Sequence, residues 1–83
     1  MKIEEKVKQI LAMLSGAETV GDEAVLQDDL ALDSLLMVTM LIEIEDAFGI
    51  TLDESDMNPF ALTTVRDVTE LVQKYTAGGE DNG

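Results

Sequence analysis

The 83-residue sequence contains no cysteine and no histidine. It therefore has no thiolate nucleophile, no disulfide, no ligands for a soft metal ion, and neither the Ser-His nor the Cys-His pair of many enzymes. Its acidic stretches also lack the Asp-x-Asp-x-Asp-Gly spacing of a calcium loop. Most of the chemistry open to small enzymes is thus excluded, and no metal site is expected.

Positive charge is scarce as well. Five Lys and Arg residues stand against 18 Asp and Glu residues, which gives a net charge of −13. Such a surface repels polyanions, so we expect no binding to nucleic acid. Because 46% of the residues are hydrophobic, the chain is nevertheless predicted to fold. We expect salt or divalent cations to stabilise it by screening the repulsion among its acids.

Long apolar runs are also missing, and the first six residues, MKIEEK, are polar and mixed in charge. No membrane span or secretion signal is therefore predicted, and we expect a cytoplasmic protein without stable membrane insertion. The length suits one small domain. We place that domain at residues 1–76, with a disordered tail at 77–83, and expect a monomer.

Hydrophobic periodicity predicts three main helices, at residues 2–14, 34–48 and 64–76. Between the first two lies a long loop, 16–33, and a short helical turn is expected within residues 56–60. No strand pattern is found. The predicted fold is therefore all-α, an antiparallel bundle of three main helices plus one short helix, with a long loop between helices one and two.

The helix at 34–48 has more apolar residues than one buried face requires. Five of them have the spacing of a core stripe: Met37, Met40, Leu41, Ile44 and Phe48. Four others lie partly off that stripe: Leu35, Leu36, Val38 and Ile42. Of these, Leu36 and Ile42 are expected to be partly exposed beside Ser34. There they would contact partner proteins or help to admit the start of a lipid-like chain.

Asp33 and Ser34 stand where this helix begins, which allows two interpretations. In the first, Ser34 only caps the start of the helix, because both residue types are common N-caps. The N-terminus of a helix is also a favourable place for a phosphate group, because free N–H groups and the positive end of the helix dipole point toward it. Ser34 would then carry a phosphodiester.

Two stretches, residues 29–35 (DLALDSL) and 43–50 (EIEDAFGI), resemble acyl carrier proteins and stand-alone peptidyl carriers. The resemblance extends over nearly the whole chain. It implies that a phosphopantetheinyl transferase attaches the 4'-phosphopantetheine of coenzyme A to Ser34. It also implies that the thiol of this arm, and not the polypeptide, holds acyl or aminoacyl groups as thioesters, so that the protein is a carrier without catalytic activity.

The same resemblance implies that Asp33 helps the transferase to recognise the site and that Leu35 is an apolar contact for partner enzymes. Twelve acids and no base lie between residues 9 and 65. Four further residues follow Ser34 along the outer face of its helix: Thr39, Ile42, Glu45 and Asp46. We expect this face, together with Leu36, to steer basic patches of partner enzymes into weak and rapid encounters.

Three positions differ from the pattern of the family. Ala31 stands where glycine is usual, Leu36 replaces a common acid, and Thr39 lacks a charge. The cargo therefore stays open among a fatty acid, a polyketide unit and an amino acid. The expected partners are the transferase, a loading ligase or transferase, and downstream synthase or condensing enzymes. The alternative is an unmodified acidic helical adaptor or inhibitor that covers a basic partner surface.

Overall fold

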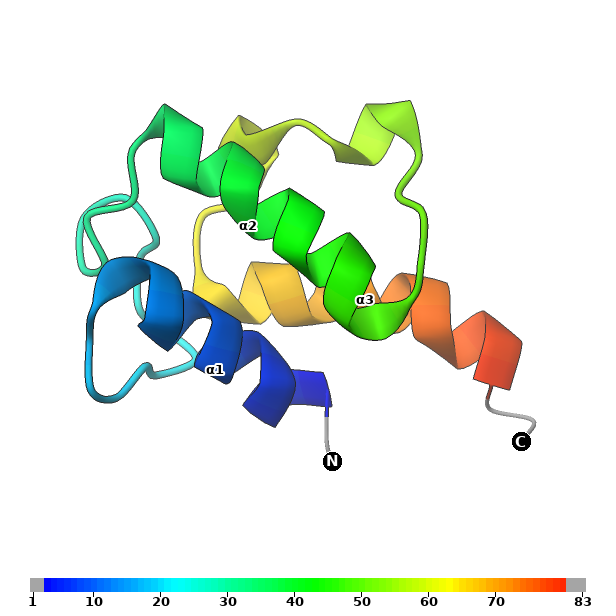
Figure 1. Cartoon of the computed structure of the whole chain (residues 1–83), viewed down its shortest axis with the longest axis horizontal. Coiled ribbons are helices and arrows are strands. Elements are labelled where there is room, and N and C mark those ends of the chain that lie inside the picture. The colour runs from blue at the N-terminus through cyan, green and yellow to red at the C-terminus, as the bar shows by residue number, and fades with distance from the viewer. Residues whose placement is uncertain (1–2, 81–83) are drawn as a thin grey trace.

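Three α-helices and two short 3-10 helices make up the computed structural model, which describes residues 3–80 (Figure 1). In chain order they are α1 (Ile3–Ser15), α2 (Ser34–Phe48), η1 (Glu54–Asp56), η2 (Pro59–Ala61) and α3 (Val65–Glu80). Within the described residues, extended pairing is limited to an isolated antiparallel bridge between Val25 and Thr64. The predicted all-α fold, with its long loop between α1 and α2, is confirmed.

The helices differ from the prediction in two main places, and α1 also ends one residue later than predicted, at Ser15. The single short helix expected at 56–60 is two 3-10 turns, and the second begins at Pro59, where a missing backbone N–H costs nothing. α3 continues to Glu80, four residues beyond the predicted end at 76. A glycine pair, Gly78-Gly79, weakens this last turn but keeps its N–H groups, so the helix continues. Residues 81–83, the rest of the predicted tail, lie outside the described residues.

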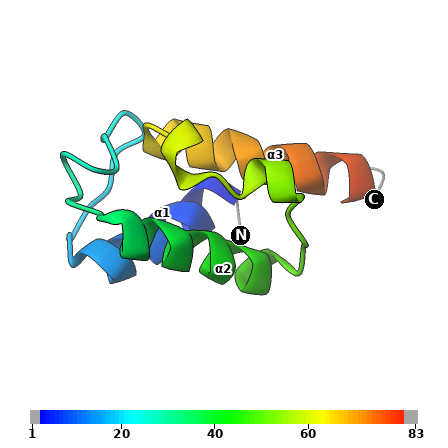
Figure 2. The same cartoon turned by 90° about the horizontal axis from the view of Figure 1, so that it is seen from above.

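The directions of the helices follow from the two long connections. α1 packs against both α2 and α3, and it runs opposite to them. α2 and α3 run in the same direction, so the crossover segment, residues 49–64, returns along the length of the bundle (Figures 1 and 2). α1 is thus antiparallel to α2 and α3, as the predicted antiparallel bundle requires, and the one crossover connection joins the two helices that run in parallel.

The core lies among the three helices and is closed by residues from both connections. From α2, four residues of the predicted core stripe are fully buried: Met37, Met40, Leu41 and Ile44. The loop after α1 adds Leu26, Leu30 and Leu32, and the crossover segment adds Leu52. Phe48, the fifth predicted core residue, is half-buried at the end of α2. The long loop is therefore packed onto the bundle rather than free.

The loop is also hydrogen-bonded to the start of α3. The backbone N–H groups of Val65 and Arg66 donate to the carbonyl oxygens of Ala24 and Asp22 over 3.1 and 2.9 Å. The first amides of a helix have no partner inside the helix, so these loop carbonyls satisfy groups that would otherwise need water. Loop one and the start of α3 are thereby held as one unit.

Thr64 and Asp67 cap α3 in a reciprocal arrangement. The Asp67 carboxylate accepts hydrogen bonds from the N–H groups of Thr64 and Thr63, at 3.0 and 2.9 Å, and Thr64 Oγ1 accepts one from Asp67 N–H. The bonds from Thr64 and Thr63 lower the pKa of the Asp67 carboxyl from its ordinary value. The predicted start of this helix at the two threonines is confirmed.

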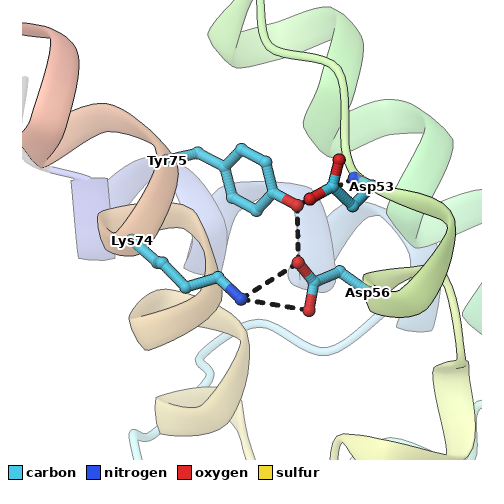
Figure 3. Close-up of polar contacts among 4 residues, drawn as sticks. All are labelled: Asp53, Asp56, Lys74 and Tyr75. Atoms are coloured by element: carbon cyan, nitrogen blue, oxygen red, sulfur yellow. Dashed lines mark hydrogen bonds and ion pairs between the residues drawn. The ribbon is translucent and has the colours of Figure 1, made fainter.

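The crossover segment is fixed to α3 by a polar cluster of four residues (Figure 3). The Tyr75 hydroxyl accepts a hydrogen bond of 2.8 Å from Asp53 N–H and donates one of 2.5 Å to Asp56. Lys74 Nζ lies 3.0 and 3.1 Å from the two carboxylate oxygens of Asp56. The bond from Tyr75, and after it the bond from Lys74, lowers the pKa of the Asp56 carboxyl from its ordinary value. One tyrosine thus joins two points of the crossover segment to the last helix.

The C-terminal end of α2 is held from α1. α2 has no basic residue in its last turn, but Lys6 of α1 donates from Nζ to the Ala47 carbonyl over 2.9 Å. The same Nζ lies 5.3 Å from the centre of the Phe48 ring. A cation at this end of a helix offsets the negative end of the dipole. Lys6 therefore fixes α2 against α1 at the end opposite to Ser34.

Candidate functional site

Asp33, and not Ser34, is the N-cap of α2. Its backbone is extended, and its Oδ1 accepts a hydrogen bond of 2.8 Å from Leu36 N–H. Ser34 is the first residue inside the helix, and its side chain is exposed. The hydrogen bonds of the described residues do not use its hydroxyl group. The interpretation of Ser34 as the cap is therefore wrong, because the Asp33 carboxylate caps the helix.

The chain reaches Ser34 through a tight reversal at Ala31. Ala31 has φ 53°, in the left-handed region that residues with a side chain rarely adopt. The residues on either side of it, Leu30 and Leu32, are both buried, and Leu32 N–H donates to the Leu26 carbonyl over 3.0 Å. The reversal thus directs two leucines into the core and leaves the next two residues, 33 and 34, on the surface.

The surroundings of Ser34 suit a phosphate group, and the sequence around it has no histidine, lysine or arginine. The positive end of the α2 dipole favours an anion, and the first turn of α2 contains no acid. The chain has no histidine, and no Lys or Arg lies between residues 9 and 65. A serine hydroxyl without a base beside it is a poor nucleophile. Ser34 is exposed and thus accessible to another protein, while the carboxylate beside it, that of Asp33, is engaged as the helix cap.

An exposed apolar stripe begins next to Ser34. Leu35, Val38 and Ile42 are 74%, 40% and 54% exposed, and their spacing of three and four residues places them on one face of α2. Leu35 and Ile42 were expected on this surface. Val38 was predicted to lie partly off the core stripe but was not among the predicted contact residues, although its spacing from the other two marks it as one of them. Leu36 is half-buried against the core, which fits its expected partial exposure.

The other predicted residues of this face are less uniform. Asp46 is exposed, whereas Thr39 is half-buried and donates from Oγ1 to the Leu35 carbonyl over 2.9 Å. Glu45 is half-buried too, and its Oε2 accepts a hydrogen bond of 2.8 Å from Leu52 N–H. Glu45 therefore holds the crossover segment against α2 in addition to carrying charge. A shallow depression at this end of the face is lined by Ile42, Glu43, Glu45 and Asp46.

The acids of α2 have no basic partner among the described residues. The described basic side chains are engaged elsewhere: Lys6 with the Ala47 carbonyl, Lys8 with Asp22, Arg66 with Glu23 and Lys74 with Asp56. The outer face of α2 consequently presents uncompensated negative charge next to its apolar stripe. Such a face attracts positively charged proteins at long range.

Two further searches cover the part of the chain that the structure describes. There, no three Asp or Glu side chains are grouped so as to hold a metal ion. Within the same residues, no helix combines the length and the apolar character needed to cross a membrane.

The family model and the similar proteins found by comparison agree with one another. A family model described as "Phosphopantetheine attachment site" matches residues 2–72. The chain is 42% identical to an acyl carrier protein of Desulforapulum autotrophicum over 77 residues, which cover 89% of this chain and 97% of that protein. It is 35% identical to an acyl carrier protein of Thermotoga maritima over 71 residues, 83% and 85% of the two chains.

A third relative is much longer. The chain is 37% identical to a non-reducing polyketide synthase of Emericella nidulans over 83 residues, which span 98% of this chain but 3% of the synthase. The similarity thus includes both proteins of the same length and a short part of a large synthase.

Proposed function

The chain belongs to the family of acyl carrier proteins, which have a phosphopantetheine attachment site, and we propose that Ser34 is the residue to which this group is attached. A carrier of this family is not a catalyst. The observation that supports Ser34 is its exposed hydroxyl on the first residue of α2, which the helix leaves unused because Asp33 is the cap. Family membership also favours a carrier over an unmodified acidic adaptor.

In the proposed modification, Ser34 Oγ forms a bond to the phosphorus that carries the pantetheine part of coenzyme A. The bond between that phosphorus and the bridging oxygen of the pyrophosphate breaks, and adenosine 3',5'-bisphosphate leaves. The hydroxyl proton passes to a base on the transferase, because the carboxylate next to Ser34, that of Asp33, is engaged with Leu36 N–H as the helix cap. Once attached, the group supplies the thiol that forms thioesters with the cargo. The start of α2 stabilises the resulting phosphodiester.

We further propose that the outer face of α2 is the surface on which partner enzymes dock. Its predicted residues are Asp33, Leu35, Leu36, Thr39, Ile42, Glu45 and Asp46. The exposure of Leu35 and Ile42 and the unpaired charge of Asp46 support this role most directly. A few exposed apolar side chains bind a partner weakly, and acids speed up the encounter with basic partners. Weak binding and rapid encounter both suit a protein that must leave each enzyme again.

The partners we propose are a phosphopantetheinyl transferase, an enzyme that loads the cargo, and downstream synthase or condensing enzymes, all in the cytoplasm. The names of the relatives, acyl carrier protein and polyketide synthase, favour an acyl or polyketide cargo over an amino acid.

The attachment is tested by intact-mass measurement after incubation with coenzyme A and a broad-specificity transferase. The wild-type protein is expected to gain the mass of one phosphopantetheine group, and Ser34→Ala to gain none. Ser55→Ala removes another exposed serine, in η1, and is expected to be modified like the wild type. Because Ser34 is not the cap, its loss is expected to change stability by less than about 0.5 kcal/mol. Modification of Ser34→Ala would exclude Ser34 as the site.

A further inference from the structure

Phe60 is an aromatic side chain left on the surface. It is 64% exposed, whereas Phe48 and Tyr75 are half-buried against the core. It lies in η2, which packs against α2, and both views place η2 beside the first half of that helix (Figures 1 and 2). An exposed phenylalanine lacks the stabilisation that burial of its apolar surface would give. This ring therefore stands near the start of α2 with most of its apolar surface unused.

The outward position of the ring follows from the turn that contains it. Phe60 N–H donates to Asn58 Oδ1 over 3.0 Å, and Ala61 N–H donates to the Asn58 carbonyl over 3.1 Å. On either side, Met57 and Leu62 pack against the core. The chain is thus anchored before and after the turn, and the turn itself is closed by hydrogen bonds. The ring is held on the surface by this local structure.

A small depression adjoins the ring. Its walls come from the loop before α2, from η2 and from the residues after η2: Val25, Gln27, Phe60, Leu62 and Thr63. The two segments are joined by a hydrogen bond of 2.9 Å from Leu26 N–H to the Thr63 carbonyl. Its volume is about 100 Å³, well below the 300–1,000 Å³ of sites for small molecules. It suits a single side chain of a protein partner rather than a cofactor or metabolite.

Charge indicates what kind of partner would approach. Gln27 is followed by Asp28 and Asp29 in the exposed part of the loop, and no base lies between residues 9 and 65. Asp28 is exposed, while Asp29 accepts a hydrogen bond from Val25 N–H. An apolar side chain flanked by Lys or Arg residues complements such a surface in both shape and charge.

We propose that Phe60 and this depression are a second contact, separate from the outer face of α2, for the phosphopantetheinyl transferase that modifies Ser34. The transferase would insert an apolar side chain, flanked by basic residues, beside the Phe60 ring. This proposal rests on the proposed function, because an enzyme that reaches Ser34 at the start of α2 also comes close to η2. Aromatic anchors of this kind contribute much of the binding energy in protein interfaces.

The test compares Phe60→Ala with Met13→Ala in the modification reaction, using the transferase that modifies the wild-type protein. Met13 lies on α1 and is also 64% exposed, so it is a matched control. For the apo carrier as substrate, Phe60→Ala is expected to raise KM about tenfold, the effect of losing one anchor, with kcat within about twofold. Met13→Ala is expected to leave both constants unchanged.

A second pair of variants leaves the ring in place. Gln27→Lys adds a positive charge to the depression and is expected to raise KM, whereas Gln73→Lys on the exposed surface of α3 makes the same change elsewhere and is expected to have little effect.

Equal constants for Phe60→Ala and Met13→Ala would overturn the proposal. It would also be overturned if Phe60→Ala changed only the stability of the modified protein, since the occupant would then be the carrier's own arm. Failure of the wild type to be modified would instead contradict the proposed function itself.

Discussion

At the scale of single residues, the neighbouring side chains of Asp33 and Ser34 differ in what they do at the start of α2. Asp33 caps the start of the helix with its carboxylate, and the next residue, Ser34, keeps its hydroxyl exposed. The left-handed conformation of Ala31 places both on the surface while Leu30 and Leu32 enter the core. Three short-range features therefore determine where the Ser34 hydroxyl stands and how accessible it is.

Substitutions of Asp33 are expected to separate capping from recognition. Asn keeps an oxygen that accepts from Leu36 N–H, so Asp33→Asn should stay within about 0.5 kcal/mol of wild-type stability, whereas Asp33→Ala should lose about 1 kcal/mol. If the carboxylate is recognised by the transferase, both variants should be modified several-fold more slowly. Urea unfolding gives the stabilities, and mass spectrometry over time gives the rates. Wild-type rates for Asp33→Asn would restrict this residue to capping.

At the scale of elements, α2 is held along its whole length by contacts from other segments. Asp33 caps its start, Lys6 of α1 donates to the Ala47 carbonyl at its end, and the Glu45 carboxylate binds Leu52 N–H of the crossover segment. The crossover segment is in turn bonded to Tyr75 of α3. The apolar stripe and the acids of α2 are consequently presented on a fixed helix, which favours docking without a cost for ordering it.

The Asp56 contacts predict a dependence of stability on acid. The pKa of Asp56 is lowered in the folded protein, so its ionised form contributes stability above its ordinary pKa of 3.8. That contribution is lost as the pH falls through the lowered value. Asp56→Asn should therefore unfold at lower urea concentration at pH 7, with a smaller further loss between pH 5 and pH 3. Tyr75→Phe removes the first cause of the shift and should behave similarly.

Two further variants test whether the acid dependence of stability comes from the Asp56 carboxylate and its Tyr75 partner. Asp53→Asn retains the backbone N–H that binds Tyr75, so it should keep the acid dependence of the wild type. Lys74→Met removes the second, more exposed partner of Asp56 and should have a smaller effect than Tyr75→Phe. An unchanged acid slope in both Asp56→Asn and Tyr75→Phe would show that the cluster in Figure 3 does not stabilise the fold through this carboxylate.

At the scale of the whole molecule, the net charge of −13 acts on stability and on association in opposite directions. Salt screens the repulsion among the acids and is expected to raise the melting temperature. The same screening weakens the attraction of a basic partner, so association with the transferase should slow as salt rises. Stopped-flow association and thermal unfolding over the same salt series measure both effects.

The part of this charge that lies on α2 is tested by a double variant. Glu45→Gln with Asp46→Asn removes two charges, and the Gln oxygen can still accept from Leu52 N–H. Association is expected to slow several-fold at low salt. Glu4→Gln with Glu5→Gln removes two exposed charges from α1 and should have a smaller effect. Equal slowing by the two pairs would mean that only the overall charge matters and that the α2 face has no special role.

The sequence by itself determined the helices, the packed stripe of α2 and the exposed position of Ser34. Each depends on residues three or four positions apart: apolar spacing for the helices, and Asp33 with Leu36 for the start of α2. Glycine and proline positions indicated the connections, although α3 continued past Gly78-Gly79 because glycine weakens a helix without interrupting its hydrogen bonds. Local chemistry was sufficient for all of these features.

Only the tertiary structure decided which polar and apolar side chains of the surface are engaged. Lys6 finds its acceptor 41 residues away, and Tyr75 binds Asp53 across 22 residues, so no local pattern marks either one. Glu45 was expected to be purely a surface charge, and its second role depends on where the crossover segment returns. Periodicity tells which face of a helix is apolar, but only the path of distant segments decides what covers it.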